Sequence, residues 1–308
     1  MARLIRLISA PTGLGLRPPK PGALPGCSGA PTALRSAGLF RRFEDEGAAD
    51  LGTVAPGRYS ADVKTGHIRN ETQIIKFSKS LAEKISLAVN AGDSPLVIGG
   101  DCSVLMGAGL ALKKRGRYGL VHIDGHTDFR HPGNSSRIAS LAGEDLAAAI
   151  GLHWKSISDI DGAGPYFDPQ NVIHLGCRAN DEYLPEVRNA IHSAASSNDT
   201  KRCGARSVAE EAVSAMKSLG VDGFWLHLDV DVLDPRYMPA VDSPDPGGIG
   251  PRQLAKLLAT LAPWAAGAEV TVFNPDLDPS GVYARLLTGV VFSGLRHLSQ
   301  KALDTLHP

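Results

Sequence analysis

Short apolar runs alternate with amphipathic segments along most of the chain. The apolar runs are nearly continuous, as in strands that are buried on both faces of a sheet. They cover residues 4–11, 95–99, 119–123, 171–176, 223–230, 269–273 and 289–295. Apolar positions at helical spacing occur between them, at residues 77–90, 103–114, 207–219 and 251–261. This alternation predicts parallel βαβ units and an α/β fold with a central, mainly parallel sheet.

The chain is predicted to form a single domain over residues 1–308. It shows no internal repeat, and the Gly/Pro-rich stretch at 11–31 is its one linker-like segment. The polar stretch at 193–204 is predicted to be a surface loop. The first 43 residues contain seven basic and no acidic residues, which is typical of an organelle targeting segment. Residues 4–11 also read as a first strand and residues 30–43 as a loop followed by a short helix, so both interpretations stay open.

Composition excludes several classes of function. Basic and acidic residues number 32 each, whereas proteins that bind nucleic acid carry a positive excess, so no nucleic-acid partner is expected. No stretch reaches the ~18 uncharged apolar residues that a membrane span requires, so no membrane partner is expected. Four scattered cysteines without a CxxC pair favour a reducing compartment and a cytoplasmic location.

Metal-capable side chains follow two of the predicted strands. Asp124, His126 and Asp128 follow residues 119–123, and Asp229 and Asp231 follow residues 223–228. In extended backbone, side chains two residues apart point to the same face, so each set converges. Ligands of parallel sheets bind at the carboxyl ends of the strands, where both sets lie. The sequence therefore predicts one cluster of four carboxylates and one imidazole.

Such a cluster requires cations, because four neighbouring carboxylates repel one another. Two divalent ions match the charge, and oxygen ligands with one imidazole suit Mn²⁺. Cys102 follows another strand and is predicted either to be a small buried side chain or to ligate metal, in which case Fe, Ni or Zn becomes a possible ion. Asp101 and Asp234 are predicted to stabilise turns. His122 and His227 are predicted to be core or helix-facing histidines that alternate away from the ligand face.

Three segments resemble the signatures of the arginase/agmatinase (ureohydrolase) family, in the family's order and spacing. They are Gly-Gly-Asp-Cys-Ser at 99–103, Asp-Gly-His-Thr-Asp at 124–128 and Asp-Val-Asp-Val-Leu-Asp-Pro at 229–235. Residues 29–39 resemble the family's N-terminal loop, and residues 274–275 resemble the turn after its penultimate strand. The resemblance implies a three-layer α/β/α fold, a binuclear manganese centre and hydrolysis of a guanidinium-type C–N bond.

The resemblance also implies a set of ligands, with Asp128 additionally orienting a bridging hydroxide. The first ligand of the family is usually histidine, and here it is cysteine. A thiolate would raise the pKa of the bridging water and favour a more reactive substrate, such as an N-hydroxyguanidine. The implied metal ligands are Cys102, Asp124, His126, Asp128, Asp229 and Asp231.

The substrate loops depart from the arginase pattern. Ala142 stands near the position of the family's proton-shuttling histidine, and Val272 stands where arginases carry a glutamate, which argues against a plain arginase. Glu269 should face the opposite side of its strand from Val272. His131 and Glu144 are candidates for proton transfer to the leaving amine. The candidate substrate-binding residues are Asp181, Asn134, Ser136 and Ser243.

The sequence thus favours a binuclear-metal hydrolase that acts on a small guanidino compound or derivative. One alternative is an arginase-fold protein that has lost catalysis and acts in binding or assembly, which the residues at 102, 142 and 272 motivate. Another is a metal-dependent hydrolase of amides. The resemblance also suggests a homo-oligomer, often a trimer.

Overall fold

The structure is a computed structural model that describes residues 3–303. Within these residues, eight strands form one sheet in which every pairing is parallel. The strands are β1 (Ile5–Ala10), β2 (Ala49–Thr53), β3 (Ser94–Gly99), β4 (Tyr118–Ile123), β5 (Val172–Leu175), β6 (Ser193–Ala195), β7 (Gly223–Asp229) and β8 (Gly267–Thr271). Their spatial order is β2-β1-β3-β8-β7-β4-β5-β6.

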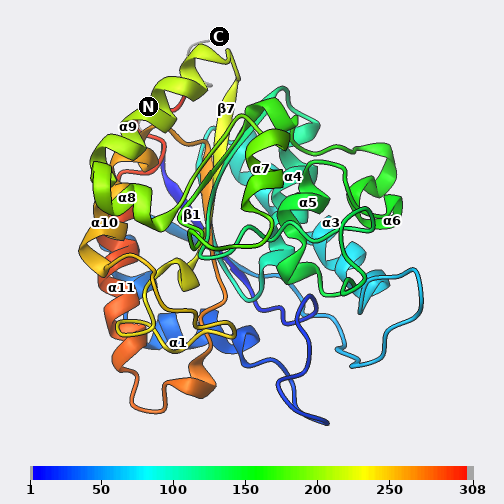
Figure 1. Cartoon of the computed structure of the whole chain (residues 1–308). Coiled ribbons are helices and arrows are strands. Elements are labelled where there is room, and N and C mark those ends of the chain that lie inside the picture. The colour runs from blue at the N-terminus through cyan, green and yellow to red at the C-terminus, as the bar shows by residue number, and fades with distance from the viewer. Residues whose placement is uncertain (1–2, 304–308) are drawn as a thin grey trace.

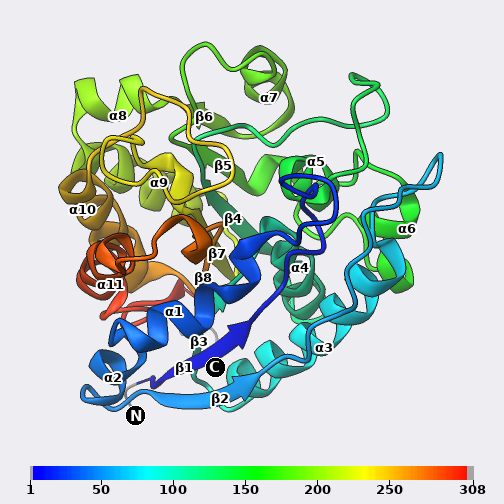
Figure 2. The same cartoon turned by 90° about the horizontal axis from the view of Figure 1, so that it is seen from below.

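Helices cover both faces of the sheet, which gives three layers (Figures 1 and 2). The helices are α1 (Ala30–Ser36), α2 (Leu39–Glu44), α3 (Glu71–Asn90), α4 (Leu105–Lys113), α5 (Asp145–Ala149), α6 (Lys155–Ser158), α7 (Leu184–Ala190), α8 (Ser197–Cys203), α9 (Ala205–Ser218), α10 (Pro251–Leu261) and α11 (Val282–Leu295). Buried residues of α1, α2, α9, α10 and α11 share one hydrophobic core, and those of α3 to α7 share the other. The three-layer α/β/α fold is therefore confirmed.

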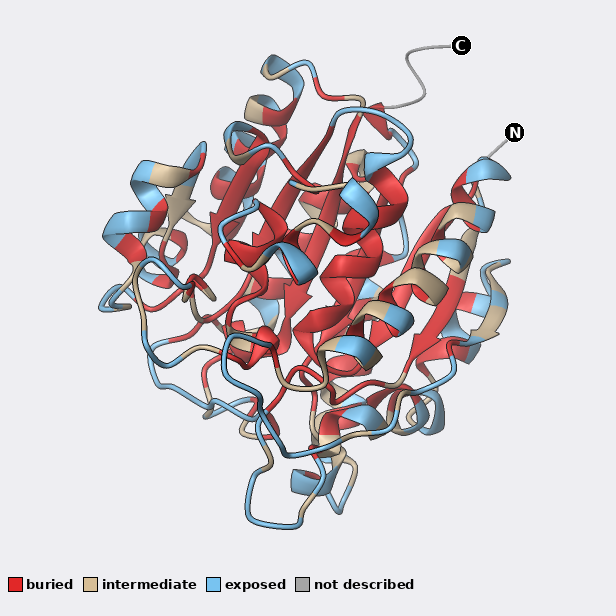
Figure 3. Cartoon of the chain, turned by 90° about the vertical axis from the view of Figure 1, so that its right-hand side faces the viewer, coloured by how far each residue is buried: buried red, intermediate tan, exposed pale blue. Residues whose placement is uncertain are grey.

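The sequence pattern explains the central elements. Every residue of β3, β4 and β7 is buried, as their continuous apolar runs predict (Figure 3). Helix α10 begins with proline at its first position and buries leucines at 254, 257, 258 and 261 against the sheet. Strand β1 pairs with both β2 and β3, so residues 5–10 are part of the sheet.

Three predictions about elements are wrong. Residues 289–295 form the second half of α11, because Leu287, Val290, Val291 and Leu295 are buried at helical spacing. Residues 193–204 form β6 and α8 instead of a loop, since an edge strand and an exposed helix tolerate polar residues. Ser196 and Asp199 close the first turn of α8 with a capping box. Residues 30–43 contain two short helices, α1 and α2, in place of a loop and one helix.

No helix within residues 3–303 is long and apolar enough to span a membrane.

Candidate metal centre

The carboxyl ends of β4 and β7 meet at the floor of a pocket. The two strands are neighbours, with Ile123 opposite Leu228, so the residues that follow them lie side by side. Ligand atoms of Asp124, Asp229 and Asp231 all lie within 4.8 Å of one another, as do those of Asp124, His126 and Asp128. We call these five residues the acidic centre. The structure therefore brings together the carboxylates and the imidazole that the sequence places after these strands.

Backbone amides hold the carboxylates of the acidic centre in place. Asp124 Oδ1 accepts from the His126 N–H at 2.6 Å, and Asp229 Oδ1 accepts from the Asp231 N–H at 2.7 Å. Asp231 Oδ1 accepts from the Gly125 N–H at 2.9 Å, which ties the two strand ends together. Asp124 Oδ2 is buried and has no hydrogen-bond partner. One oxygen of each of these three carboxylates thus fixes the loop, and among the second oxygens that of Asp124 is left without a partner.

The electrostatics of the acidic centre favour bound cations. Burial and repulsion from neighbouring carboxylates raise the pKa of Asp124 and of Asp229 well above the ordinary value. Burial raises the pKa of Asp128 to about 7. Burial opposes a charge on His126, but Asp231, with Nδ1 and Oδ2 2.9 Å apart, raises the pKa of His126 to about 11. Oxygen donors with one imidazole fit divalent ions, which remove this repulsion.

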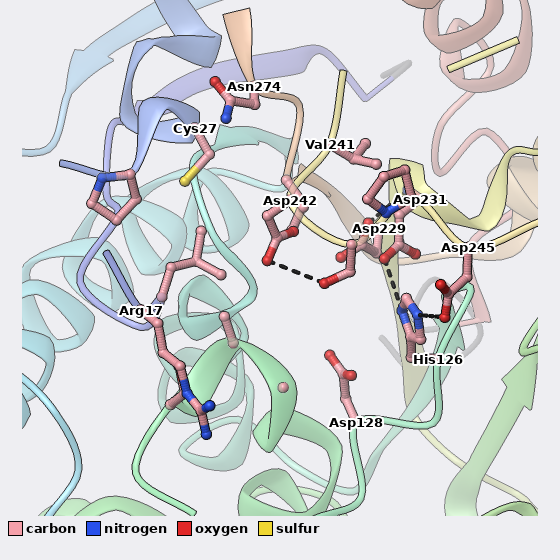
Figure 4. A pocket seen from close by; sticks show the side chains of 18 of the residues that line it. Arg17, Cys27, His126, Asp128, Asp229, Asp231, Val241, Asp242, Asp245 and Asn274 are labelled. Carbon is pink, nitrogen blue, oxygen red and sulfur yellow. Dashed lines mark hydrogen bonds and ion pairs between the residues drawn. The ribbon is translucent and has the colours of Figure 1, made fainter. Parts of the chain in front are cut away.

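Asp128 has a backbone conformation that is rare for its residue type. Its φ of 45° lies in the left-handed region, where residues other than glycine are strained. Strain of this kind persists where the surrounding structure holds a functional side chain in place. Figure 4 shows the Asp128 carboxylate pointing into the same space as Asp229, Asp231 and Asp242.

Cys102 lies beside the acidic centre and is fully buried. Its Sγ donates to Asp229 Oδ2 at 3.0 Å and lies 3.1 Å from Thr271 Oγ1. Burial, followed by the charge of Asp229, raises the pKa of the Cys102 thiol well above its ordinary value. The neutral thiol is therefore the form that this environment favours, and a metal ion would have to displace the proton to gain a thiolate ligand.

A pocket of about 850 Å³ opens above the acidic centre. Two of the predicted substrate residues, Asp181 and Ser243, line it. The Asp181 carboxylate accepts from the Thr127 N–H at 3.0 Å, the Thr127 hydroxyl at 2.7 Å and the Tyr183 N–H at 2.9 Å, so it stabilises the pocket wall. The pocket wall comes from the loops after β1 (residues 16–19 and 25–27), β4 (126–130), β5 (180–183) and β7 (241–245).

The other two candidate substrate residues lie in the loop after Asp128 and do not line the pocket. Asn134 donates its side-chain amide to the Phe129 carbonyl at 2.9 Å and to Glu186 Oε2 at 2.9 Å. Ser136 is exposed. Asn134 therefore shapes the loop from behind the pocket wall.

The two candidate proton-transfer residues also lie behind the pocket wall. His131 Nε2 lies 3.1 Å from Glu186 Oε1, and its Nδ1 accepts from the Gly133 N–H. Glu144 is fully buried and accepts from the backbone N–H groups of residues 139 and 140. Neither residue lines the pocket, so any effect on a bound molecule would pass through the loop that they stabilise.

The pocket contains further charged residues, of which sequence reasoning missed Asp242 and Arg17. Asp242 lines it and is exposed. Arg17 and Arg130 line it as well. These residues sit on loops without a periodic pattern, so only the folded chain places them here. Val272 lines the pocket at a φ of 70°, and Glu269 points away from it toward His227, as expected.

The prediction that His122 and His227 face away from the ligands is wrong. They precede Asp124 and Asp229 by two residues, and the period of a strand is two, so they share the face of these ligands. His122 Nε2 lies 3.9 Å from Asp124 Oδ2. Both histidines are fully buried, but the Nε2 atom of each has no hydrogen-bond partner.

Comparisons with known proteins agree with the resemblance found in the sequence. A sequence model described as Arginase family matches residues 9–295. The arginase of Bacillus subtilis (strain 168) is 30% identical over 288 residues, covering 90% of this chain and 93% of that protein. The arginase of Bacillus caldovelox is 32% identical over 260 residues, covering 80% and 85%. A native structure of the Bacillus caldovelox arginase matches with a TM-score of 0.84 and 27% identity, covering 95% of this chain and 98% of that one. The chain belongs to the arginase family.

Proposed function

We propose that the chain is a metal-dependent hydrolase that cleaves a C–N bond of a guanidino compound or derivative. The observation that carries this proposal is the convergence of five metal-capable side chains, four of which line a pocket of about 850 Å³. Membership of the arginase family supports the choice of reaction. Relatives that are 30% and 32% identical are named arginases.

The acidic centre would hold two divalent ions through Asp124, His126, Asp128, Asp229 and Asp231. When bound, the ions supply positive charge that activates water as a nucleophile and polarises the bond to be cleaved. Four carboxylates with one imidazole favour manganese. Ligation by the Cys102 thiolate would shift this preference toward iron, nickel or zinc. Carboxylate oxygens that accept no backbone N–H would hold the ions.

Asp128 is the residue we propose for proton handling. Its carboxylate faces the pocket (Figure 4), so it could accept a proton from water there and return it. His131 and Glu144 would support this step as positioning residues, since they stabilise the loop that follows Asp128. Asp128 would therefore both bind metal and transfer protons.

The pocket wall suggests how a guanidino substrate is selected. Asp242 and Ser243 face the pocket on one loop, and Asp181 lines it on another. A guanidinium group is planar and rich in N–H donors, so carboxylates of this kind can accept from it. Arg17 and Arg130 can pair with an anionic group at the other end of the substrate. Val272 places an apolar side chain at the wall where arginases carry a glutamate, which argues against arginine itself as the substrate.

Urea release by the manganese-loaded chain tests the proposed function. The substrates are arginine, N-hydroxyarginine, agmatine and a set of acyl-amines, with Asp229→Asn as the inactive control. Urea or hydroxyurea from a guanidino compound, absent in the control, supports the proposal. Acid release from acyl-amines alone indicates an amide hydrolase. No turnover after loading with each of Mn, Fe, Ni and Zn contradicts the proposal and favours a non-catalytic role.

A cytoplasmic location and a homo-oligomer are proposed alongside this activity.

A further inference from the structure

The two ring nitrogens of His126 face different carboxylates. Nδ1 lies 2.9 Å from Asp231 Oδ2 and 3.9 Å from Asp124 Oδ1, both in the acidic centre. Nε2 points the other way and lies 3.2 Å from Asp245 Oδ2 (Figure 4). Nδ1 is therefore the nitrogen that can meet an ion in the acidic centre, and Nε2 is left to Asp245.

Asp245 approaches His126 from the pocket wall. It belongs to the loop at 241–245, which has no regular secondary structure and lines the pocket. The Asp245 side chain is 64% exposed. An exposed side chain gains little from a single charged contact and loses rotamer freedom when it is held there. The position of Asp245 beside His126 therefore needs a cause elsewhere in the structure.

A buried arginine fixes the backbone at Asp245. Arg178 Nε and Nη2 both donate to the Asp245 carbonyl, at 3.1 and 2.5 Å. Nη2 also donates to the Asp231 carbonyl at 2.9 Å, and the Arg178 backbone N–H donates to the Gly125 carbonyl at 2.9 Å. Arg178, which is 5% exposed, thus joins the segments after β4 and β7 to the loop that carries Asp245. Protein atoms alone place the carboxylate beside His126.

This placement decides which nitrogen of His126 carries the lone pair. An ionised carboxylate only accepts hydrogen bonds, so contact with Asp245 requires a hydrogen on Nε2. A neutral imidazole has one N–H, so a hydrogen on Nε2 leaves the lone pair on Nδ1, toward the acidic centre. Metal-binding histidines commonly donate their other N–H to a carboxylate in this way, which fixes the ring and makes it a stronger ligand.

We propose that Asp245 is a positioning residue, which holds His126 with Nδ1 toward the acidic centre as a metal ligand. The proposal deepens the proposed function and rests on it, because it requires ions in the acidic centre. Asp245 acts through His126, so its loss should weaken ion binding more than turnover at saturating metal. Carboxylates in this role contribute about 10- to 100-fold to metal affinity, and the exposure of Asp245 favours the lower value.

Ion affinity tests the proposal in the full chain. Competition with a coloured chelator measures the dissociation constant of Mn²⁺ in the parent protein, Asp245→Ala and Asp245→Asn. Alanine removes the acceptor and should weaken binding about tenfold, while kcat at saturating Mn²⁺ stays close to that of the parent. Asparagine keeps an acceptor oxygen, so its loss of affinity should be smaller. The control is Glu182→Ala, which removes another exposed carboxylate of the pocket wall, one that pairs with Arg137, and should leave the affinity unchanged.

A proton signal separates this role from a merely structural one. The acidic centre contains one imidazole, so the chain loaded with Co²⁺ should give one paramagnetically shifted ¹H resonance from the Nε2–H of His126. This hydrogen exchanges with water, and the hydrogen bond to Asp245 should slow the exchange. Asp245→Ala should therefore broaden or remove the resonance, whereas Glu182→Ala should keep it.

The outcomes distinguish this proposal from the proposed function. Equal Mn²⁺ affinity in the parent and in folded Asp245→Ala, or a resonance that this change leaves intact, overturns the positioning role even if urea is released. Weaker binding in Asp245→Ala without turnover of any guanidino compound by the parent supports the role and contradicts the function. A parent chain that binds no ion overturns both. Asp245→Asn keeps the size of the side chain and carries the same two measurements if Asp245→Ala does not fold.

Discussion

The acidic centre and the buried pair His122 and His227 lie on the same face of the same two strands, yet they are built differently. The carboxylates of the acidic centre stand beyond the strand ends, where backbone N–H groups are free to bind Asp124, Asp229 and Asp231. Two residues deeper, the backbone N–H groups belong to the sheet ladder, so side chains must orient the imidazoles. Depth along a strand therefore decides whether the backbone or other side chains orient a polar group.

The two regions also differ in access to solvent. Four residues of the acidic centre line the open pocket, whereas both histidines are fully buried. An ion in the acidic centre can meet water and substrate directly. The two histidines meet neither, so they act on the reaction only through the strand ends that they support.

The largest expected effect comes from Asp231→Asn in the acidic centre. This change removes a charge that His126 and the ions would share, so urea release should fall by more than about 100-fold, beyond the loss typical of residues that only support a ligand. Measurement of kcat/KM with the best guanidino substrate checks it. Glu182→Gln is the matched control, because Glu182 also lines the pocket but is exposed and pairs with Arg137. Equal activity of Asp231→Asn and the parent would remove the acidic centre from the mechanism.

Chelation should separate the two regions, because only the acidic centre would hold ions. Loss of an ion present at 100 times its dissociation constant removes about 2.7 kcal/mol of stability. For a chain of 308 residues, Tm should fall by about 4 °C. Differential scanning fluorimetry with metal-saturated chelator as the control measures this shift, and an unchanged Tm would contradict the comparison.

The smallest expected effect is the pH dependence of folding stability in the metal-free chain. The pKa of Asp128 is about 7 in the folded chain, against about 3.9 when unfolded. Between these values the folded chain holds a proton that the unfolded chain has released. The contribution of protonated Asp128 to the free energy of unfolding is therefore fully present below pH about 4. It is lost as pH rises through about 7. The stability of the parent relative to Asp128→Asn should fall over this range. Urea denaturation with a chelator present measures it, and parallel pH profiles would contradict the assignment.

Sequence reasoning was least accurate where tertiary contacts changed the meaning of a local pattern. The apolar run at 289–295 resembles a buried strand, but it lies in α11, which packs against α10, α2 and α1, so it is apolar on most sides. The polar residues at 193–204 form an edge strand and an exposed helix because neither element needs two buried faces. Edge strand β2 has no apolar run and was not predicted.

The sequence by itself determined the parallel α/β fold and the acidic centre, because strand spacing and the common direction of parallel strands fix where residues after β4 and β7 point. Only the tertiary structure placed Asp245 beside His126 and brought Asp242 into the pocket. These two residues lie on a loop outside the strands, whose course depends on packing against the rest of the chain. Local periodicity carries no information about such long-range contacts.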